Sequence, residues 1–302
     1  MTSDFNSQFS VQIISTENTI RSKNLESKLN EFGLRFQISP GVVPKESDFH
    51  NGSIHSAFLS KLILQRDLRI GEVGCALAHR NAIANFLNLD NEFGLIFEDD
   101  AEVISEFNLD IIRKVLDSTS PRLIVFGWGP GFAIANNRKV YLSEDPVELI
   151  TPPLGTFAYA INIPAAKLMI SAHKKIVDVA DWPIHVLNKI TFYSTASPWI
   201  DTNYDEEFST IGGRSDPIPN SPMRVLVSRI MLINSLVMLI LLSKTHKLNV
   251  SPKQIVHRLI IQPMLYEYGL NQVDKESTTS QIFRLPSKFK KFGLVPSRWT
   301  RV

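Results

Sequence analysis

The chain has 302 residues, of which 44% are hydrophobic and 21% charged, enough for one large domain or a domain with an appendage. This composition excludes a disordered protein, and the single cysteine excludes both an intrachain disulfide and a zinc site built from several cysteines. The net charge of +2 conceals an asymmetry, because residues 1–220 carry 19 Lys and Arg against 27 Asp and Glu, whereas residues 221–302 carry 13 against 3. We therefore expect a globular body and a basic tail that faces phosphate, membrane or nucleic acid.

The first seventy residues show alternating strand and helix patterns. Residues 11–14 are apolar enough for a strand, and apolar residues at helical spacing over 25–32 predict a helix that Gly33 ends. Residues 34–38 alternate like a second strand. Residues 42–70 are less regular, and we expect a loop-rich insertion that leads into a short helix.

The most informative stretch follows directly. Residues 72–88 predict an amphipathic helix, and residues 94–97 predict a strand buried on both faces. Glu98, Asp99 and Asp100 come next without a break. Three acids at the carboxyl edge of a strand repel one another unless a cation lies among them, and this edge is where open α/β sheets bind ligands. The alternative is a solvated acidic turn or a cap for a following helix.

Strand and helix patterns continue to about residue 180. Residues 123–126 predict a second buried strand, and residues 155–163 alternate as a further strand. Pro164 suits the first turn of a helix that reaches about residue 176. The alternation of strands and helices predicts an α/β fold with a mostly parallel sheet.

A proline-rich segment at 217–222 predicts a domain boundary, with a catalytic domain over 1–220 and a basic, largely helical region over 221–302. Residues 225–242 are mostly apolar, but their longest uncharged run has 13 residues, fewer than the ~20 that span a membrane. They form either a core helix or a helix in the membrane interface. The lysines and phenylalanines of 288–292 suit lipid headgroups or, as the alternative, nucleic acid. The amino terminus has no signal-peptide pattern, so we expect a cytoplasmic protein, peripheral on the inner membrane face.

Several motifs together resemble glycosyltransferase family 25, the lipopolysaccharide-biosynthesis type, over roughly residues 10–215. The stronger motifs are Gly71-Glu72, Gly74-Cys75 with His79, the strand end G-L-I-F-E-D-D, and G-T-F-A-Y-A-I at 155–161; the weaker ones are Asp181-Trp182-Pro183 and Ser209-Thr210-Ile211 with Arg214. The resemblance implies a GT-A-like fold, a nucleotide-sugar donor, a divalent metal such as Mn²⁺ or Mg²⁺, and inverting transfer of a sugar, often galactose, to a glycan acceptor. Three departures weaken the choice of sugar. Glu98 stands where an Asp-x-Asp pattern would begin, Ala78 stands where many relatives have serine, and the stretch before residue 155 lacks the tryptophan that some relatives carry.

The resemblance also implies roles for single residues. Asp100 would be the direct metal ligand, and Glu98 would either bind the metal or hold the ribose or a metal-bound water. The residues expected at the donor site are Arg21, Glu72, Glu98, Asp99, Thr156 and Arg214. Two alternatives stay open, because Glu72 also suits a helix cap and a lone arginine is often a surface residue.

Inverting transfer requires a base for the acceptor hydroxyl, and Asp181 is the candidate. Trp182 and Pro183 would surround it with a partly apolar rim, and such surroundings raise the pKa of a carboxyl group. The alternative is that Asp181 caps a helix beginning at Trp182. His79 and Cys75 are one helical turn apart and form half of a zinc site, but no second pair completes it in the sequence. A packed cysteine and a hydrogen-bonded histidine are the simpler interpretation.

Two rival functions remain. A receiver-type phosphoacceptor domain also ends a strand in E-D-D, with Asp145 as the acceptor, although such domains place their acids near the start. The other rival is a non-catalytic membrane-peripheral scaffold on a transferase-like core.

Overall fold

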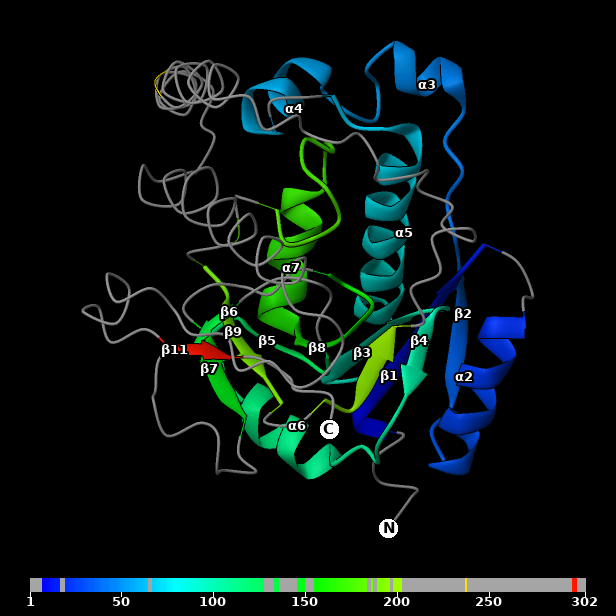
Figure 1. The fold of residues 1–302 in the computed structure, drawn as a ribbon, viewed down its shortest axis with the longest axis vertical. Coiled ribbons are helices and arrows are strands. Elements are labelled where there is room, and N and C mark those ends of the chain that lie inside the picture. The colour runs from blue at the N-terminus through cyan, green and yellow to red at the C-terminus, as the bar shows by residue number, and fades with distance from the viewer. Residues whose placement is uncertain are drawn as a thin grey trace, which may run out of the picture.

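A computed structural model describes residues 7–16, 20–64, 67–127, 133–135, 146–149, 155–183, 186, 189–195, 198–202, 237 and 295–297. A nine-stranded sheet crosses the molecule, with helices packed on both of its faces (Figure 1). Its strands, in sheet order, are β11 (Val295–Ser297), β6 (Ala133–Ala135), β7 (Val147–Leu149), β9 (Thr191–Ser194), β5 (Arg122–Val125), β8 (Ala158–Asn162), β3 (Phe93–Glu98), β1 (Phe9–Ser15) and β2 (Phe36–Pro40). A separate pair is formed by β4 (Ala101–Val103) and β10 (Ile200–Thr202). The helices are α2 (Ile20–Glu31), α3 (Glu46–His50), α4 (Ala57–Leu64), α5 (Ile70–Leu87), α6 (Leu109–Leu116) and α7 (Ile163–Ala172).

The strand directions confirm the predicted α/β fold with a mostly parallel sheet. Strand β1 pairs in parallel with β2 and β3, and β5 pairs in parallel with β9. Strand β8 lies between β3 and β5 and is antiparallel to both, so β1, β2, β3, β5 and β9 run in one direction and β8 runs in the other. The insertion of β8 against this direction was not predicted by the sequence pattern.

Two hydrophobic layers hold the helices to the sheet. Leu95, Ile96 and Phe97 of β3 are 0% exposed, because helices cover both faces of this strand. Ile96 packs with residues of α5 and α7, whereas Leu95 and Phe97 pack with residues of α2 and α6 on the opposite face. Figure 1 shows α5 and α7 together on one side of the sheet. The uninterrupted apolar run of this strand thus reflects burial from both sides.

The register brings three strand ends to one edge of the sheet. Ile14 of β1 lies opposite Glu98 of β3, and Phe97 lies opposite Ala158 of β8. The carboxyl ends of β1 and β3 therefore meet the amino end of β8, because β8 runs the other way. The three consecutive acids lie at this edge.

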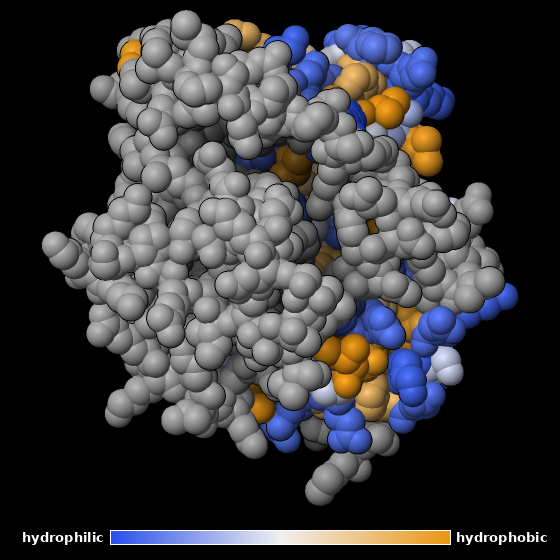
Figure 2. All heavy atoms as spheres, in the orientation of Figure 1, coloured by the Kyte–Doolittle hydropathy of each residue, from blue (hydrophilic) through white to orange (hydrophobic). Residues whose placement is uncertain are grey.

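Several predicted boundaries need correction. The strand expected at 34–38 is β2 at Phe36–Pro40, and the helix expected to reach 176 ends at Ala172. The segment expected to be loop-rich contains both α3 and α4. The surface over these two helices carries mainly hydrophilic side chains with hydrophobic ones among them (Figure 2). Phe58 of α4 is a large hydrophobic residue that is 60% exposed.

The predicted domain boundary at 217–222, the apolar segment 225–242 and the lysine-rich segment 288–292 lie outside the described residues, apart from Val237. In the part of the chain that the structure describes, no helix combines the length and the apolar character needed to cross a membrane.

Candidate active site

The three acids occupy the predicted edge, and each is half-buried. Asp99 is tied to the neighbouring strand, because the Ser15 hydroxyl at the end of β1 donates to its Oδ2 over 2.8 Å. Asp100 leads directly into β4. These carboxylates present oxygen atoms, the donors that Mg²⁺ and Mn²⁺ prefer, and their half-buried position leaves access from solvent. The donor set therefore fits a hard divalent cation.

Glu98 is directed at two buried partners. Its Oε1 lies 3.1 Å from Nε2 of His79 and accepts a hydrogen bond of 3.0 Å from the Thr156 hydroxyl. The other ring nitrogen of His79, Nδ1, lies 3.2 Å from the Tyr159 hydroxyl. His79 is 1% exposed, and both of its ring nitrogens have hydrogen-bond partners inside the protein, as buried polar atoms require. The predicted hydrogen-bonded histidine is confirmed.

Tyr159 closes this network from β8. It is 0% exposed, and its pKa is raised well above the usual 10.0, first by burial and then by the charges of Glu98 and Cys75. Its hydroxyl therefore keeps its proton at neutral pH. The ring packs edge-on against Trp182 with centroids 5.3 Å apart. Its complete burial makes Tyr159 a core residue.

The side chain of Asp181 is held by the backbone just before β8. Its Oδ2 accepts a hydrogen bond of 2.8 Å from the backbone N–H of Gly155, which has a φ of +91°. The next residue, Trp182, has a φ of +36° and is 0% exposed. A positive φ is strained for a residue with a bulky side chain, and such strain is often found at functional sites. None of the described residues from 181 to 190 belongs to a helix.

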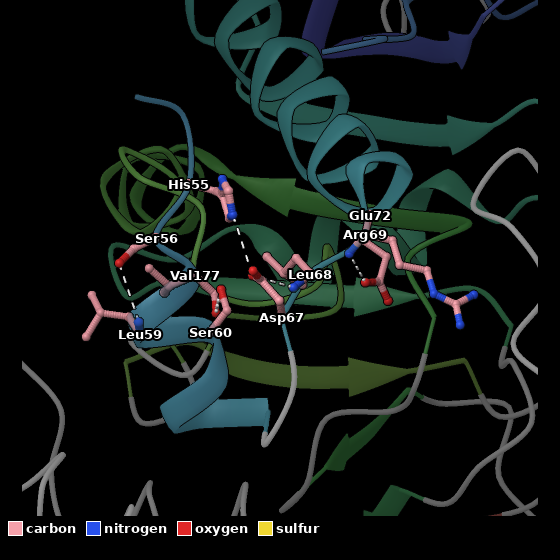
Figure 3. A network of polar contacts seen from close by, with 9 residues as sticks. All are labelled: His55, Ser56, Leu59, Ser60, Asp67, Leu68, Arg69, Glu72 and Val177. Carbon is pink, nitrogen blue, oxygen red and sulfur yellow. Dashed lines mark hydrogen bonds and ion pairs between the residues drawn. The ribbon is translucent and has the colours of Figure 1, made fainter. Parts of the chain in front are cut away.

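Glu72 contacts the backbone at the start of α5. In the first turn of α5, its Oε2 accepts a hydrogen bond of 2.8 Å from the backbone N–H of Arg69 (Figure 3). This contact satisfies a donor that the start of the helix leaves open, which is the capping role of a glutamate at this position. The cap alternative for Glu72 is therefore supported.

The remaining candidates are only partly placed. Arg21 lies in the first turn of α2, whereas Arg214 and the rival phosphoacceptor Asp145 lie outside the described residues. Sequence reasoning missed Ser15 altogether. The sequence did contain a signal for Ser15, because it lies at the end of the first predicted strand, and polar side chains at such strand ends reach the ligand-binding edge of the sheet.

The first part of the chain matches the model of a known protein family. Residues 9–127 match the model of glycosyltransferase family 25 (LPS biosynthesis protein). The matched segment contains the cysteine and histidine of α5 and all three acids of the β3 edge. The predicted resemblance to this family is confirmed over this segment.

Comparisons with solved structures add distant likenesses. The A197 protein from STIV is 11% identical with a TM-score of 0.38, covering 66% of this chain and 86% of the other. A glycosyltransferase involved in glycosylation of the major capsid of PBCV-1 is 12% identical with a TM-score of 0.30, covering 55% and 65%. A putative glucose-1-phosphate thymidylyltransferase from Bacillus anthracis, in complex with a sucrose, is 13% identical with a TM-score of 0.33, covering 64% and 89%. No curated protein matches the chain.

Proposed function

We propose that this protein is a metal-dependent inverting glycosyltransferase that moves a sugar, galactose in the favoured case, from a UDP-linked donor to a lipopolysaccharide or another glycan acceptor. The observation that carries the proposal is the placement of the acids of the family-matched segment at the ligand edge of the sheet, with Asp99 anchored to Ser15. A nucleotide-sugar donor leaves as a diphosphate, whose charge such an edge accommodates only together with a cation.

Asp100 is proposed as the direct ligand of Mn²⁺ or Mg²⁺, with Asp99 beside it. Oε1 of Glu98 already contacts His79 and Thr156. We therefore assign Glu98 to the ribose or to a metal-bound water, and not to direct coordination of the metal. When bound, the cation would stabilise the negative charge of the departing diphosphate as a Lewis acid.

Asp181 is proposed as the general base. It would take the proton of the acceptor hydroxyl while the hydroxyl oxygen bonds to the anomeric carbon of the sugar and the bond from that carbon to the diphosphate breaks. The hydrogen bond from the Gly155 N–H fixes one oxygen of the carboxylate, which orients Asp181 before the acceptor arrives. Attack opposite the departing diphosphate inverts the anomeric centre.

The proposal is tested by calorimetric titration of UDP into the full chain with and without Mn²⁺. We expect binding that requires Mn²⁺ and disappears in Asp100→Ala. The matched control is Asp90→Ala, because Asp90 is exposed in the turn before β3 and far along that strand from the acids. Metal-independent binding, or unchanged binding in Asp100→Ala, would overturn the metal assignment.

We also propose that the basic residues of 221–302 hold the enzyme against an anionic membrane. The support is their charge, 13 Lys and Arg against 3 Asp and Glu. Cosedimentation with vesicles containing anionic lipid is expected at low salt and not with neutral vesicles. Equal binding to both kinds of vesicle would contradict this proposal.

A further inference from the structure

We propose that Cys75, His79 and Glu98 form a binding site for a thiophilic divalent metal, Zn²⁺, which is distinct from the hard-cation site at Asp100. One ligand atom from each of the three residues lies within 4.8 Å of the other two. The sequence offered only Cys75 and His79, one turn apart on α5. The structure adds the third ligand from the end of β3. This inference shares Glu98 with the donor site proposed above, but it does not depend on the proposed function.

The distance between the histidine and glutamate ligand atoms suits tetrahedral zinc. Nε2 of His79 and Oε1 of Glu98 are 3.1 Å apart. Zinc bonds of about 2.0–2.2 Å to nitrogen and oxygen place two ligand atoms about 3.3 Å apart in a tetrahedron. A zinc ion between them therefore takes the place of the proton that these two atoms now share, with little movement of either side chain.

The donor set and its charge select the metal. A thiolate, an imidazole and a carboxylate are the sulfur, nitrogen and oxygen ligands that zinc takes, whereas Mg²⁺ and Mn²⁺ prefer oxygen alone. A thiolate and a carboxylate carry two negative charges, and a neutral imidazole adds none. The complex with Zn²⁺ is therefore neutral, which lowers the cost of placing charge in a half-buried site.

The surroundings orient the histidine and leave a way in. Tyr159 contacts the second ring nitrogen of His79, and such outer contacts fix the orientation of a metal-binding histidine. Cys75 and Glu98 are only half-buried, while His79 is buried between them. Three protein ligands leave a fourth position for water, as in zinc sites that exchange a ligand.

The test uses the fact that Cys75 is the only cysteine of the chain, so that a thiol reagent reports on this residue alone. Zn²⁺ is titrated into the metal-free full chain by calorimetry, and alkylation of the thiol is followed with and without Zn²⁺. We expect one zinc per chain, slowed alkylation, and a thiolate-to-metal absorption band when Co²⁺ replaces Zn²⁺. Cys75→Ser is expected to abolish the band, and His79→Gln to weaken zinc binding at least tenfold.

Two controls make the result decisive. His50→Gln changes an exposed histidine on α3 and is expected to leave zinc affinity unchanged. Asp100→Ala is expected to keep zinc binding, and Cys75→Ser to keep Mn²⁺-dependent UDP binding, so this inference and the proposed function fail separately. Circular dichroism checks that each variant is folded. Absence of zinc binding, or zinc binding that persists unchanged in folded Cys75→Ser, would overturn the site.

Discussion

The two hydrogen-bond partners of His79 determine which of its ring nitrogens carries the proton. The Glu98 carboxylate can only accept, so the ring nitrogen facing it, Nε2, must carry the hydrogen. In the neutral imidazole, Nδ1 then has no hydrogen and accepts one from the Tyr159 hydroxyl. The Tyr159 hydroxyl therefore donates to His79, and His79 donates to Glu98. Each hydrogen bond fixes the proton position that the other requires.

Tyr159→Phe removes the first donor of this chain. The buried Nδ1 of His79 loses its partner, so we expect the free energy of unfolding to fall by about 1–3 kcal/mol. The pKa of Tyr159 is raised in the folded protein, so its contribution to stability is complete below pH 10 and is lost as pH rises from there toward the folded-state pKa. Urea unfolding at pH 7 and at about pH 10.5 measures both effects. The variant should lose less stability between the two pH values than the wild type, and an equal loss would contradict the assignment.

Asp181→Asn tests the base at the level of one atom. The amide keeps an oxygen that can accept from the Gly155 N–H, but it cannot take a proton from the acceptor. We expect kcat to fall by roughly 10²–10⁴-fold while UDP binding is unchanged. Steady-state kinetics and calorimetry separate the two, with Asp90→Asn as the control. A loss of UDP affinity equal to the loss of kcat would make Asp181 a binding residue instead.

At the scale of elements, α5 is fixed by a close approach at Gly74. A Cβ at this position would collide with the backbone oxygen of Val42, in the segment after β2. In an open helical position, a change from glycine to alanine stabilises by about 1 kcal/mol. At Gly74, the cost of the collision with the Val42 backbone exceeds this gain in helix propensity. The glycine thus sets how closely the segment after β2 approaches the helix that carries Cys75 and His79.

We therefore expect Gly74→Ala to destabilise the protein by about 1–3 kcal/mol, the opposite sign from its helix propensity. Thermal and urea unfolding of the variant measure this. A shift of α5 would also disturb the contact between His79 and Glu98, so Co²⁺ binding at Cys75 should weaken in parallel. An increase in stability would show that the segment after β2 moves aside freely.

The sequence pattern predicted the long elements well. The helix at 72–88 and the strand at 94–97 correspond to α5 and β3, since long periodic or uniformly apolar runs reflect burial directly. It missed β4, β10 and α6, because strands of three residues and a helix of eight are too short for a clear period. For α6 a local signal existed, since the side chain of Asn108 caps its first turn.

The sequence predicted residues of the candidate site but not the hydrogen bonds that join them. Glu98, Thr156 and Asp181 were each identified from the sequence, but the hydrogen bond between Glu98 and Thr156 depends on β8 entering the sheet against the other strands. Likewise, the pairing of Ser15 with Asp99 depends on the register of β1 with β3. Strand order and register come from tertiary pairing, which a single sequence does not display.

At the scale of the whole molecule, one buried amide joins both sides of the sheet. The Asn162 side chain, at the end of β8, donates to the backbone oxygens of Leu116, the last residue of α6, and of Ser118 and Ser120, which follow it. Its Oδ1 accepts from the backbone N–H groups of Arg122, at the start of β5, and Ala165, in the first turn of α7. A single residue that is 2% exposed thus ties α6, β5, β8 and α7 together.

Asn162→Ala would remove the side-chain partner of these backbone groups and the cap of α7. We expect a loss of about 2–4 kcal/mol in the free energy of unfolding, measured by urea denaturation. Asn108→Ala is the matched control, because Asn108 is exposed and only caps α6. It should cost about 1 kcal/mol. Equal losses in the two variants would show that Asn162 acts as a helix cap and nothing more.

The position of β8 also has a consequence for the growing polypeptide on the ribosome. Strand β3 can pair with β1 as soon as residue 98 has emerged, but its other edge stays open until residues 158–162 follow. That open edge belongs to one of the most apolar strands of the protein, and unpaired edges of this kind invite association between chains. A fragment ending at residue 127, where the family match stops, would keep this edge permanently exposed. Expressed alone, it is expected to aggregate, whereas a chain extended through α7 would cover its own edge.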